Sequence, residues 1–246
     1  MTVDDFVHNR WADAKAALRR LDPEFVALLE LRLKADSMDL WLAPDTYAQS
    51  ERPPTKRLPR RWHNLLEACY ELTVMTQNYQ ACYAALTSEA VRGMDDVAAG
   101  RRFVYGFYTG VFYQDAVIQH TKTVMSFVAR IYGMRKGTPN QLKTRYHKKA
   151  DKIKERTDKA GNAIAHGAGT GGRFVGQALT EEQWWEVSVA VGIYPKYLLD
   201  EFHYAERGKS LRSGAYDEIM KKGPQGFLGE VATILHDFEQ EILAPG

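Results

Sequence analysis

The sequence predicts an all-α protein, an antiparallel bundle of long helices with an N-terminal helical hairpin extension. Three observations predict this fold class. Apolar residues recur every three or four positions along most of the 246 residues, which is the period of one face of an α-helix. Capping residues and prolines stand where these periodic segments begin. Only residues 173–179 suit an extended strand, and no nearby segment offers that strand a partner.

The N-terminal residues 1–35 predict the hairpin. One apolar stripe runs from Val3 to Leu21 at helical spacing. Asp22 then caps a second helix, with Pro23 in its first turn, where the missing amide hydrogen does no harm. Residues 36–60 lose the helical period and carry four prolines, which predicts a loop. This Pro-rich loop ends in a basic cluster made of Lys56, Arg57, Arg60 and Arg61.

Two long helices are predicted for the centre of the chain, from about residue 62 to 86 and from about 104 to 132, and we expect them to form the core pair. Gly106 and Gly110 stand four residues apart in the second helix. Each costs about 1 kcal/mol relative to alanine, so a close helix crossing is expected there. Cys69 and Cys82 are separated by about 20 Å along the first helix, which predicts two free thiols.

Residues 103–113 form the longest strongly apolar stretch of the chain. Its 11 residues fall short of the roughly 20 that a membrane-spanning helix needs. Six of them are aromatic, and exposed aromatic rings can stack on nucleobases. At this density in a helix, aromatic residues are more typical of a hydrophobic core. Both interpretations stay open for this stretch, with the core favoured.

Three further helices are predicted after residue 137. Thr138, Pro139 and Gln141 form a capping box with proline in the first turn, which starts a helix that continues to about Ala160 and bends at Gly161. A second capping box at residues 180–183 starts a helix that ends at Gly208, and a last helix begins near Gln225. We therefore expect one domain over residues 1–246: the hairpin (1–35), the loop (36–60), a core (61–170) and C-terminal helices (180–246).

The beginning of the chain and its cysteines predict a cytoplasmic protein. Charged residues from Asp4 onward do not fit a secretory signal. Two unpaired thiols suit a reducing compartment. No membrane partner is expected.

Positive charge is concentrated in one window of a nearly neutral chain. The 33 basic and 31 acidic residues leave a net charge of +2, yet residues 130–159 contain eleven basic and three acidic residues. The window therefore carries +8 and the rest of the chain −6. Such asymmetry predicts a phosphate-binding surface, while the alternative is a solvated helix face. The candidate nucleic-acid contacts are Lys143, Arg145, Lys148, Lys149 and Lys152.

Common catalytic and cofactor motifs are missing from the sequence. It contains no Glu-x-x-His or His-Glu-x-x-His metal motif and no Gly-x-Ser-x-Gly nucleophile elbow. Gly167, Gly169 and Gly172 match a dinucleotide-binding pattern formally, but a helix precedes them where that site needs a strand. We interpret residues 167–172 as a flexible connection and expect neither a metal nor another cofactor.

A polar ridge follows the basic window. At 100° per residue, Glu155, Lys159, Asn162 and His166 share one side of the predicted helix. A histidine can move protons near neutral pH, a cation can stabilise a pentacovalent phosphate, and an amide can orient it. The combination suits phosphodiester cleavage. The alternative is that His166 caps the end of a helix beside a glycine.

The segment Asn162-Ala-Ile-Ala-His166-Gly167, late in a chain of long amphipathic helices, resembles the signature of HEPN domains (higher eukaryotes and prokaryotes nucleotide-binding). The family motif is an arginine, often followed by a polar residue, then four to six residues to a histidine. Here Gly161 precedes Asn162, Lys159 has the six-residue gap, and Arg156 stands farther away. The likeness covers the architecture of about residues 62–170.

The resemblance implies a metal-independent endoribonuclease of a toxin–antitoxin or antiviral defence system. In that reaction a ribose 2′-OH attacks the adjacent phosphate, His166 transfers a proton, Lys159 or Arg156 stabilises the developing charge, and Asn162 positions the phosphate. Asp115 is the expected acidic residue on the neighbouring helix, either orienting the site, with Glu155, or paired with Lys122. The implied partners are RNA, a second copy of the chain in a homodimer, and an antitoxin or other protein. The alternative is a non-enzymatic helical module that binds nucleic acid or protein, so whether this chain is an enzyme stays open.

Overall fold

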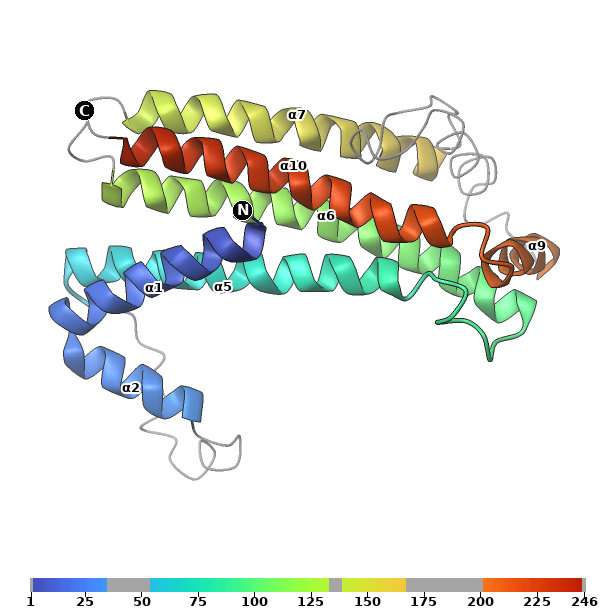
Figure 1. Ribbon diagram of the computed structural model, residues 1–246, viewed down its shortest axis with the longest axis horizontal. Coiled ribbons are helices and arrows are strands. Elements are labelled where there is room, and N and C mark those ends of the chain that lie inside the picture. The colour runs from blue at the N-terminus through green and yellow to red at the C-terminus, as the bar shows by residue number, and fades with distance from the viewer. Residues whose placement is uncertain (1, 35–53, 133–138, 167–200, 245–246) are drawn as a thin grey trace.

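The computed structural model describes residues 2–34, 54–132, 139–166 and 201–244, and all regular secondary structure in these ranges is helical (Figure 1). The predicted all-α class is therefore confirmed. The helices are α1 (Val3–Leu21), α2 (Pro23–Lys34), α5 (Arg57–Ala84), α6 (Asp96–Tyr132), α7 (Pro139–His166), α9 (Glu201–Arg212) and α10 (Asp217–Leu243).

Four long helices, α5, α6, α7 and α10, lie side by side with alternating chain direction (Figure 1). Helix α1 packs on α5 and also contacts α10, while α9 crosses the N-terminal end of α6. Helix α2 follows α1 after a sharp turn and leads away from the bundle (Figure 1). This arrangement is an antiparallel bundle, and it places α7 along one edge beside both α6 and α10.

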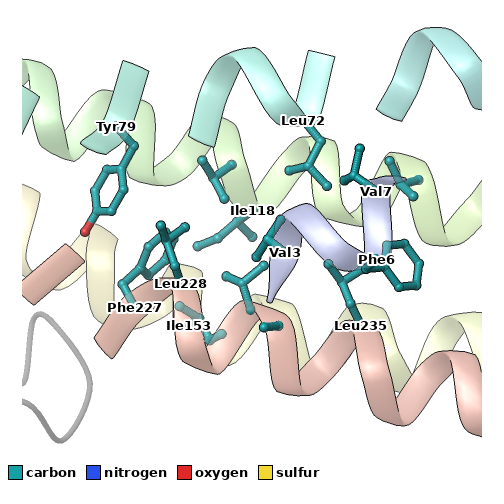
Figure 2. Packing of buried hydrophobic residues seen from close by; sticks show 14 of the residues in the cluster. Val3, Phe6, Val7, Leu72, Tyr79, Ile118, Ile153, Phe227, Leu228 and Leu235 are labelled. Carbon is teal, nitrogen blue, oxygen red and sulfur yellow. The ribbon is translucent and has the colours of Figure 1, made fainter. Parts of the chain in front are cut away.

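The hydrophobic core runs through the centre of the bundle and includes α1 (Figure 2). Phe6 of α1, Leu72 of α5 and Leu235 of α10 are completely buried and come together from three helices. Burial of such side chains contributes about 1.5–3 kcal/mol each. Helix α1 is therefore part of the core.

A local sequence signal marks the start of α2. The Asp22 carboxylate accepts a hydrogen bond of 3.3 Å from the Phe25 amide, and Pro23 is the first residue of α2. A buried ion pair fixes α1 to the bundle, because the Arg10 guanidinium lies 3.0 Å from the Glu239 carboxylate of α10. The same guanidinium lies 2.9 Å from Asp13 on its own helix.

Two helix boundaries predicted for the C-terminal part of the chain are wrong: the helix end at Gly208 and the helix start near Gln225. Helix α9 continues through Gly208 to Arg212, because this glycine lets α9 touch the backbone of α6: an added Cβ would overlap the carbonyl oxygen of Asp96. Helix α10 begins at Asp217, well before Gln225, although it then contains Pro224. Its first turns bury Ile219 and Met220, and this burial outweighs the cost of the proline.

The other helices are longer than the apolar stripes that predicted them. Helix α5 starts at Arg57, so the end of the predicted loop is helical, with Pro59 tolerated in the first turn. Helix α7 continues past Gly161 to His166. Residues 35–53, 133–138 and 167–200 lie outside the described ranges, and with them the predicted glycine connection at 167–172, the possible strand at 173–179 and the second capping box.

The close approach expected at Gly106 and Gly110 is confirmed. Added Cβ atoms would lie 2.7 Å from Leu86 Cδ2 and 2.7 Å from Tyr83 Cε2, respectively, so both glycines make room for side chains of α5 and the residues after it. This pair is therefore used inside the chain.

Both cysteines lie in α5 and are free thiols, as predicted. Burial raises the pKa of the Cys69 thiol to about 12, so this side chain behaves as an inert core residue. Among the described helices, none combines the length and the apolar character that crossing a membrane requires.

Candidate nucleic-acid interface

Helix α7 carries the positive charge and lies beside helices that are less positive. Its 28 residues contain eight basic and three acidic side chains, whereas α10 contains six acidic and two basic ones. The side chains of Tyr146, Ala150 and Ile153 are buried against the bundle. The charged residues of α7 therefore occupy its two edges and its outer face.

The edge of α7 that faces α10 is neutralised. Arg145 forms an ion pair with Glu241, which also accepts a 2.6 Å hydrogen bond from the Tyr146 hydroxyl. One turn later, the Lys149 ammonium lies 3.6 Å from Asp237. Two of the five predicted nucleic-acid contacts thus have carboxylate partners within the chain.

The outer face of α7 keeps its charge. Lys148 and Lys152 are exposed and form no ion pair with any residue in the described ranges. Lys143, on the edge toward α6, is half-buried and likewise pairs with no described carboxylate. These three lysines are the predicted contacts whose charge stays available for an anionic ligand.

The surface around these lysines is hollowed only slightly. An open groove of about 530 Å³ lies between α7 and α10, and its lining residues are Lys149, Lys152, Ile153, Glu230, Thr233 and Ile234. A second open hollow of about 440 Å³ at the start of α7 is lined by Asn140, Gln141, Thr144, Arg145 and Lys148. Small-molecule sites enclose most of their ligand, so these open, cation-rimmed hollows suit an extended polymer better.

The edge of α7 that faces α6 contains a polar contact that sequence reasoning missed. His147 Nε2 lies 3.0 Å from the Lys122 carbonyl oxygen and 3.2 Å from Ser126 Oγ, so the ring donates toward α6. Lys122 itself pairs with Asp151 at 2.5 Å. Burial lowers the pKa of His147 below its usual value, and the nearby carbonyl opposes this shift. No sequence motif marked His147, because its partner is a backbone carbonyl on another helix.

The predicted catalytic residues fall on the second half of α7. The helix is continuous to His166, so Glu155, Lys159, Asn162 and His166 belong to one helix, as expected. Glu155 is exposed. The side chains of Arg156, Lys159, Asn162 and His166 lie outside the described ones. Helix α7 is described as far as His166, and the expected helix cap at this residue stays a prediction.

Asp115 and Lys122 both lie on the edge of α6 nearest α7. Asp115 is half-buried there. One of the two expectations for Asp115 was an ion pair with Lys122. In the structure the carboxylate beside Lys122 is that of Asp151 instead. Those two groups meet because antiparallel packing brings residue 151 of α7 beside residue 122 of α6. Asp115 lies about two turns away along α6.

The six aromatic residues of the stretch 103–113 divide between core and surface. Phe103 and Phe107 are buried, and the Phe103 ring stacks on Tyr216 with a centroid distance of 5.0 Å. Tyr105 and Phe112 are 48% and 67% exposed. The core interpretation is therefore confirmed for Phe103 and Phe107, and stacking of the exposed rings on nucleobases stays a prediction.

The described residues contain no group of three histidine, cysteine, aspartate or glutamate side chains placed to hold a metal ion. Comparisons of the chain with models of known families, with curated proteins and with solved structures find no match.

Proposed function

We propose that this protein binds RNA and that the outer face of α7 is the contact surface. The observation that carries this proposal is the division of charge on α7. Arg145 and Lys149, on the edge toward α10, form ion pairs with carboxylates of α10, whereas the exposed Lys148 and Lys152 have no described partner. Exposed lysines of this kind neutralise backbone phosphates and release counterions. The two lysines stand four residues apart on α7, about 6 Å along the helix, so one nucleic-acid strand can contact both.

Salt dependence of RNA affinity tests the proposal. Binding of a labelled RNA oligonucleotide is measured by fluorescence anisotropy at several salt concentrations. Each neutralised phosphate contributes about −0.7 to the slope of log affinity against log salt for a single strand. The double variant Lys148→Ala/Lys152→Ala should therefore flatten the slope by about 1.4 and weaken binding.

The matched control is Lys222→Ala. Lys222 is an exposed lysine of α10 that pairs with Glu218 on its own helix. Its removal should leave affinity and slope unchanged. If the double variant binds RNA as the unmodified chain does, the outer face of α7 is only a solvated helix face.

The resemblance to HEPN domains extends the proposal to metal-independent RNA cleavage in a homodimer, as in toxin–antitoxin or antiviral systems. His166→Ala should slow cleavage in EDTA by roughly 10²- to 10⁴-fold and leave RNA affinity unchanged, because general acid–base catalysis contributes about that factor. Sedimentation of the two-fold dimer should give about 56 kDa, twice the 27.9 kDa chain. RNA binding without cleavage would identify the chain as a binding module.

A further inference from the structure

Each of the two hollows beside α7 contains one exposed lysine without a described partner and one cation that α10 pairs. The hollow at the start of α7 is lined by Lys148 and Arg145, and the groove between α7 and α10 is lined by Lys152 and Lys149. The two cations of each hollow stand three residues apart, so they are neighbours on the surface of the helix. A phosphate that reaches Lys148 or Lys152 therefore comes close to a cation that is already paired.

The carboxylates that pair these cations form the acidic edge of α10, defined here by Asp237 and Glu241. Helices α7 and α10 lie side by side (Figure 1). Glu241 forms an ion pair with Arg145, and the Asp237 carboxylate lies 3.6 Å from the Lys149 ammonium. Carboxylate and phosphate both offer negatively charged oxygens to a guanidinium or an ammonium. The acidic edge thus occupies two cations that a nucleic-acid backbone would also bind.

Both ion pairs are exposed to water. The side chains of Arg145 and Glu241 are 54% and 43% exposed, and those of Lys149 and Asp237 are 43% and 47% exposed. The distance between Lys149 and Asp237 is also longer than that of an ordinary hydrogen bond. Exposed ion pairs contribute little to stability, so an RNA phosphate can replace either carboxylate while the fold stays intact.

The ring of Tyr146 keeps both cations in place independently of the carboxylates. The Tyr146 side chain is buried, and its ring packs edge to face on Phe238 of α10 at a centroid distance of 5.4 Å. The Lys149 ammonium and the Arg145 guanidinium lie 4.2 Å and 5.3 Å from the Tyr146 ring centroid. The Tyr146 hydroxyl donates a 2.6 Å hydrogen bond to Glu241, so this carboxylate keeps a partner when Arg145 leaves it. An exchange of partners at this edge therefore needs no movement of either helix.

We infer that the acidic edge of α10 is an autoinhibitory contact, in which Asp237 and Glu241 compete with RNA phosphates for Lys149 and Arg145. This inference rests on the proposed function. RNA that lies on the outer face of α7 gains these two further cations only by breaking their ion pairs, so the acidic edge lowers RNA affinity. Removal of its charge makes both cations available.

The test measures binding of a labelled single-stranded RNA oligonucleotide by fluorescence anisotropy at several salt concentrations. The variants Asp237→Asn and Glu241→Gln, singly and combined, remove the negative charge and keep the size of the side chains. The combined variant should bind RNA about 3- to 25-fold more tightly, because the loss of one exposed ion pair changes an equilibrium by up to about fivefold. Its slope of log affinity against log salt should steepen by about 1.4, as two further phosphates are neutralised.

The matched control is Glu218→Gln, the same chemical change on the same helix. Glu218 is exposed and pairs with Lys222 of α10. It precedes Asp237 by nineteen residues, about 28 Å along the helix, which exceeds the distance over which salt at physiological concentration transmits a charge. Glu218→Gln should therefore leave RNA affinity and salt slope unchanged.

A second comparison separates the release of a particular cation from a general loss of repulsion. Asp237→Asn is measured both in the unmodified chain and together with Lys149→Ala. If Asp237 acts by occupying Lys149, the gain in affinity should disappear when Lys149 is alanine. If Asp237 only repels RNA, the gain should be the same in both backgrounds, and the inference is wrong.

The remaining outcomes distinguish this inference from the proposed function. If neither the unmodified chain nor the combined variant binds RNA, the proposed function fails and this inference fails with it. If the unmodified chain binds RNA with a steep salt slope and the combined variant binds no more tightly, RNA binding stands and the autoinhibitory contact alone is overturned. A gain in Glu218→Gln as large as that in Asp237→Asn would overturn it in the same way. Thermal unfolding followed by circular dichroism checks that every variant is folded.

Discussion

Helix α6 contacts its neighbours in opposite ways at its two ends. Near its N-terminus the backbones of α6 and α9 touch, because Gly100 faces the carbonyl of Tyr204 and Gly208 faces that of Asp96. Near its C-terminus α6 contacts α7 through side chains, in the ion pair of Lys122 with Asp151 and the hydrogen bonds of His147. The first contact has no room for an added atom, and the second is partly exposed to water.

This difference separates a fixed part of the molecule from an adjustable part. The crossing of α6 and α9 is reinforced by Arg212 of α9, which lies 2.6 Å from Asp96 of α6. Nearby, Asp217 at the start of α10 accepts a 2.6 Å hydrogen bond from Ser88, which lies between α5 and α6. A side chain in the contact between α6 and α7 can be replaced by one of a different charge without displacing the backbone of either helix. Substitutions on α7 should therefore report on ligand binding while the fold stays intact.

The largest effect is expected at the crossing. Gly208→Ala and Gly100→Ala would each place a Cβ inside the van der Waals radius of a carbonyl oxygen, so the two helices must separate. Overpacking of this kind costs about 3 kcal/mol or more when backbone atoms are involved. Urea unfolding followed by circular dichroism should show that loss in the free energy of unfolding.

Gly229→Ala is the control for this prediction. Gly229 lies in α10, and an added Cβ would meet no atom within 4 Å. Replacing it should raise the free energy of unfolding by up to about 1 kcal/mol, because alanine favours a helix more than glycine does. If Gly208→Ala is as stable as Gly229→Ala, α6 and α9 do not cross as closely as described.

A smaller effect is expected at the other end of α6. The Lys122 side chain is 20% exposed and the Asp151 side chain 43% exposed, so water weakens their attraction. A double-mutant cycle with Lys122→Met and Asp151→Asn should give a coupling of about 0.5–1 kcal/mol in unfolding experiments. A coupling above about 3 kcal/mol would mean that this end is as rigidly fixed as the crossing.

The smallest effect concerns pH. Burial holds the pKa of His147 below its usual value of 6.5, with Lys122 and Lys143 acting in the same direction and Asp151 against it. Between the folded and unfolded pKa values the unfolded chain binds more protons. The free energy of unfolding should therefore fall as the pH drops below about 6.5.

His147→Gln should remove part of this pH dependence, because a glutamine amide can still donate to the Lys122 carbonyl but does not titrate. Some dependence should remain, since burial also lowers the pKa of His63. Unfolding titrations between pH 5 and 7.5 measure both effects. An unchanged pH profile in His147→Gln would show that the ring is protonated equally in the folded and unfolded chain.

Local signals predicted most of the fold. The apolar period located the helices, and Asp22 with Pro23 marked the start of α2. A capping box also begins α1: the Thr2 amide donates to the Asp5 carboxylate, and the Asp5 amide donates to the Thr2 hydroxyl oxygen. Its residue types and spacing are visible in the sequence. Gly208 and Pro224 led to wrong helix boundaries in the prediction. Their local cost in a helix is smaller than the stabilisation from the packing around them.

The candidate site was predictable only in part. The sequence determined that one long helix concentrates the basic residues, because charge and helical period are properties of consecutive positions. The tertiary structure decided which cations stay available for a ligand. Arg145 and Lys149 form ion pairs with carboxylates of α10 almost a hundred residues away, whereas Lys148 and Lys152 are exposed without a described partner. It likewise decided that Phe112 meets water while the other phenylalanines of its helix stretch are buried. Exposure and ion pairing depend on which helices become neighbours, and that neighbourhood is set by the packing of the whole bundle.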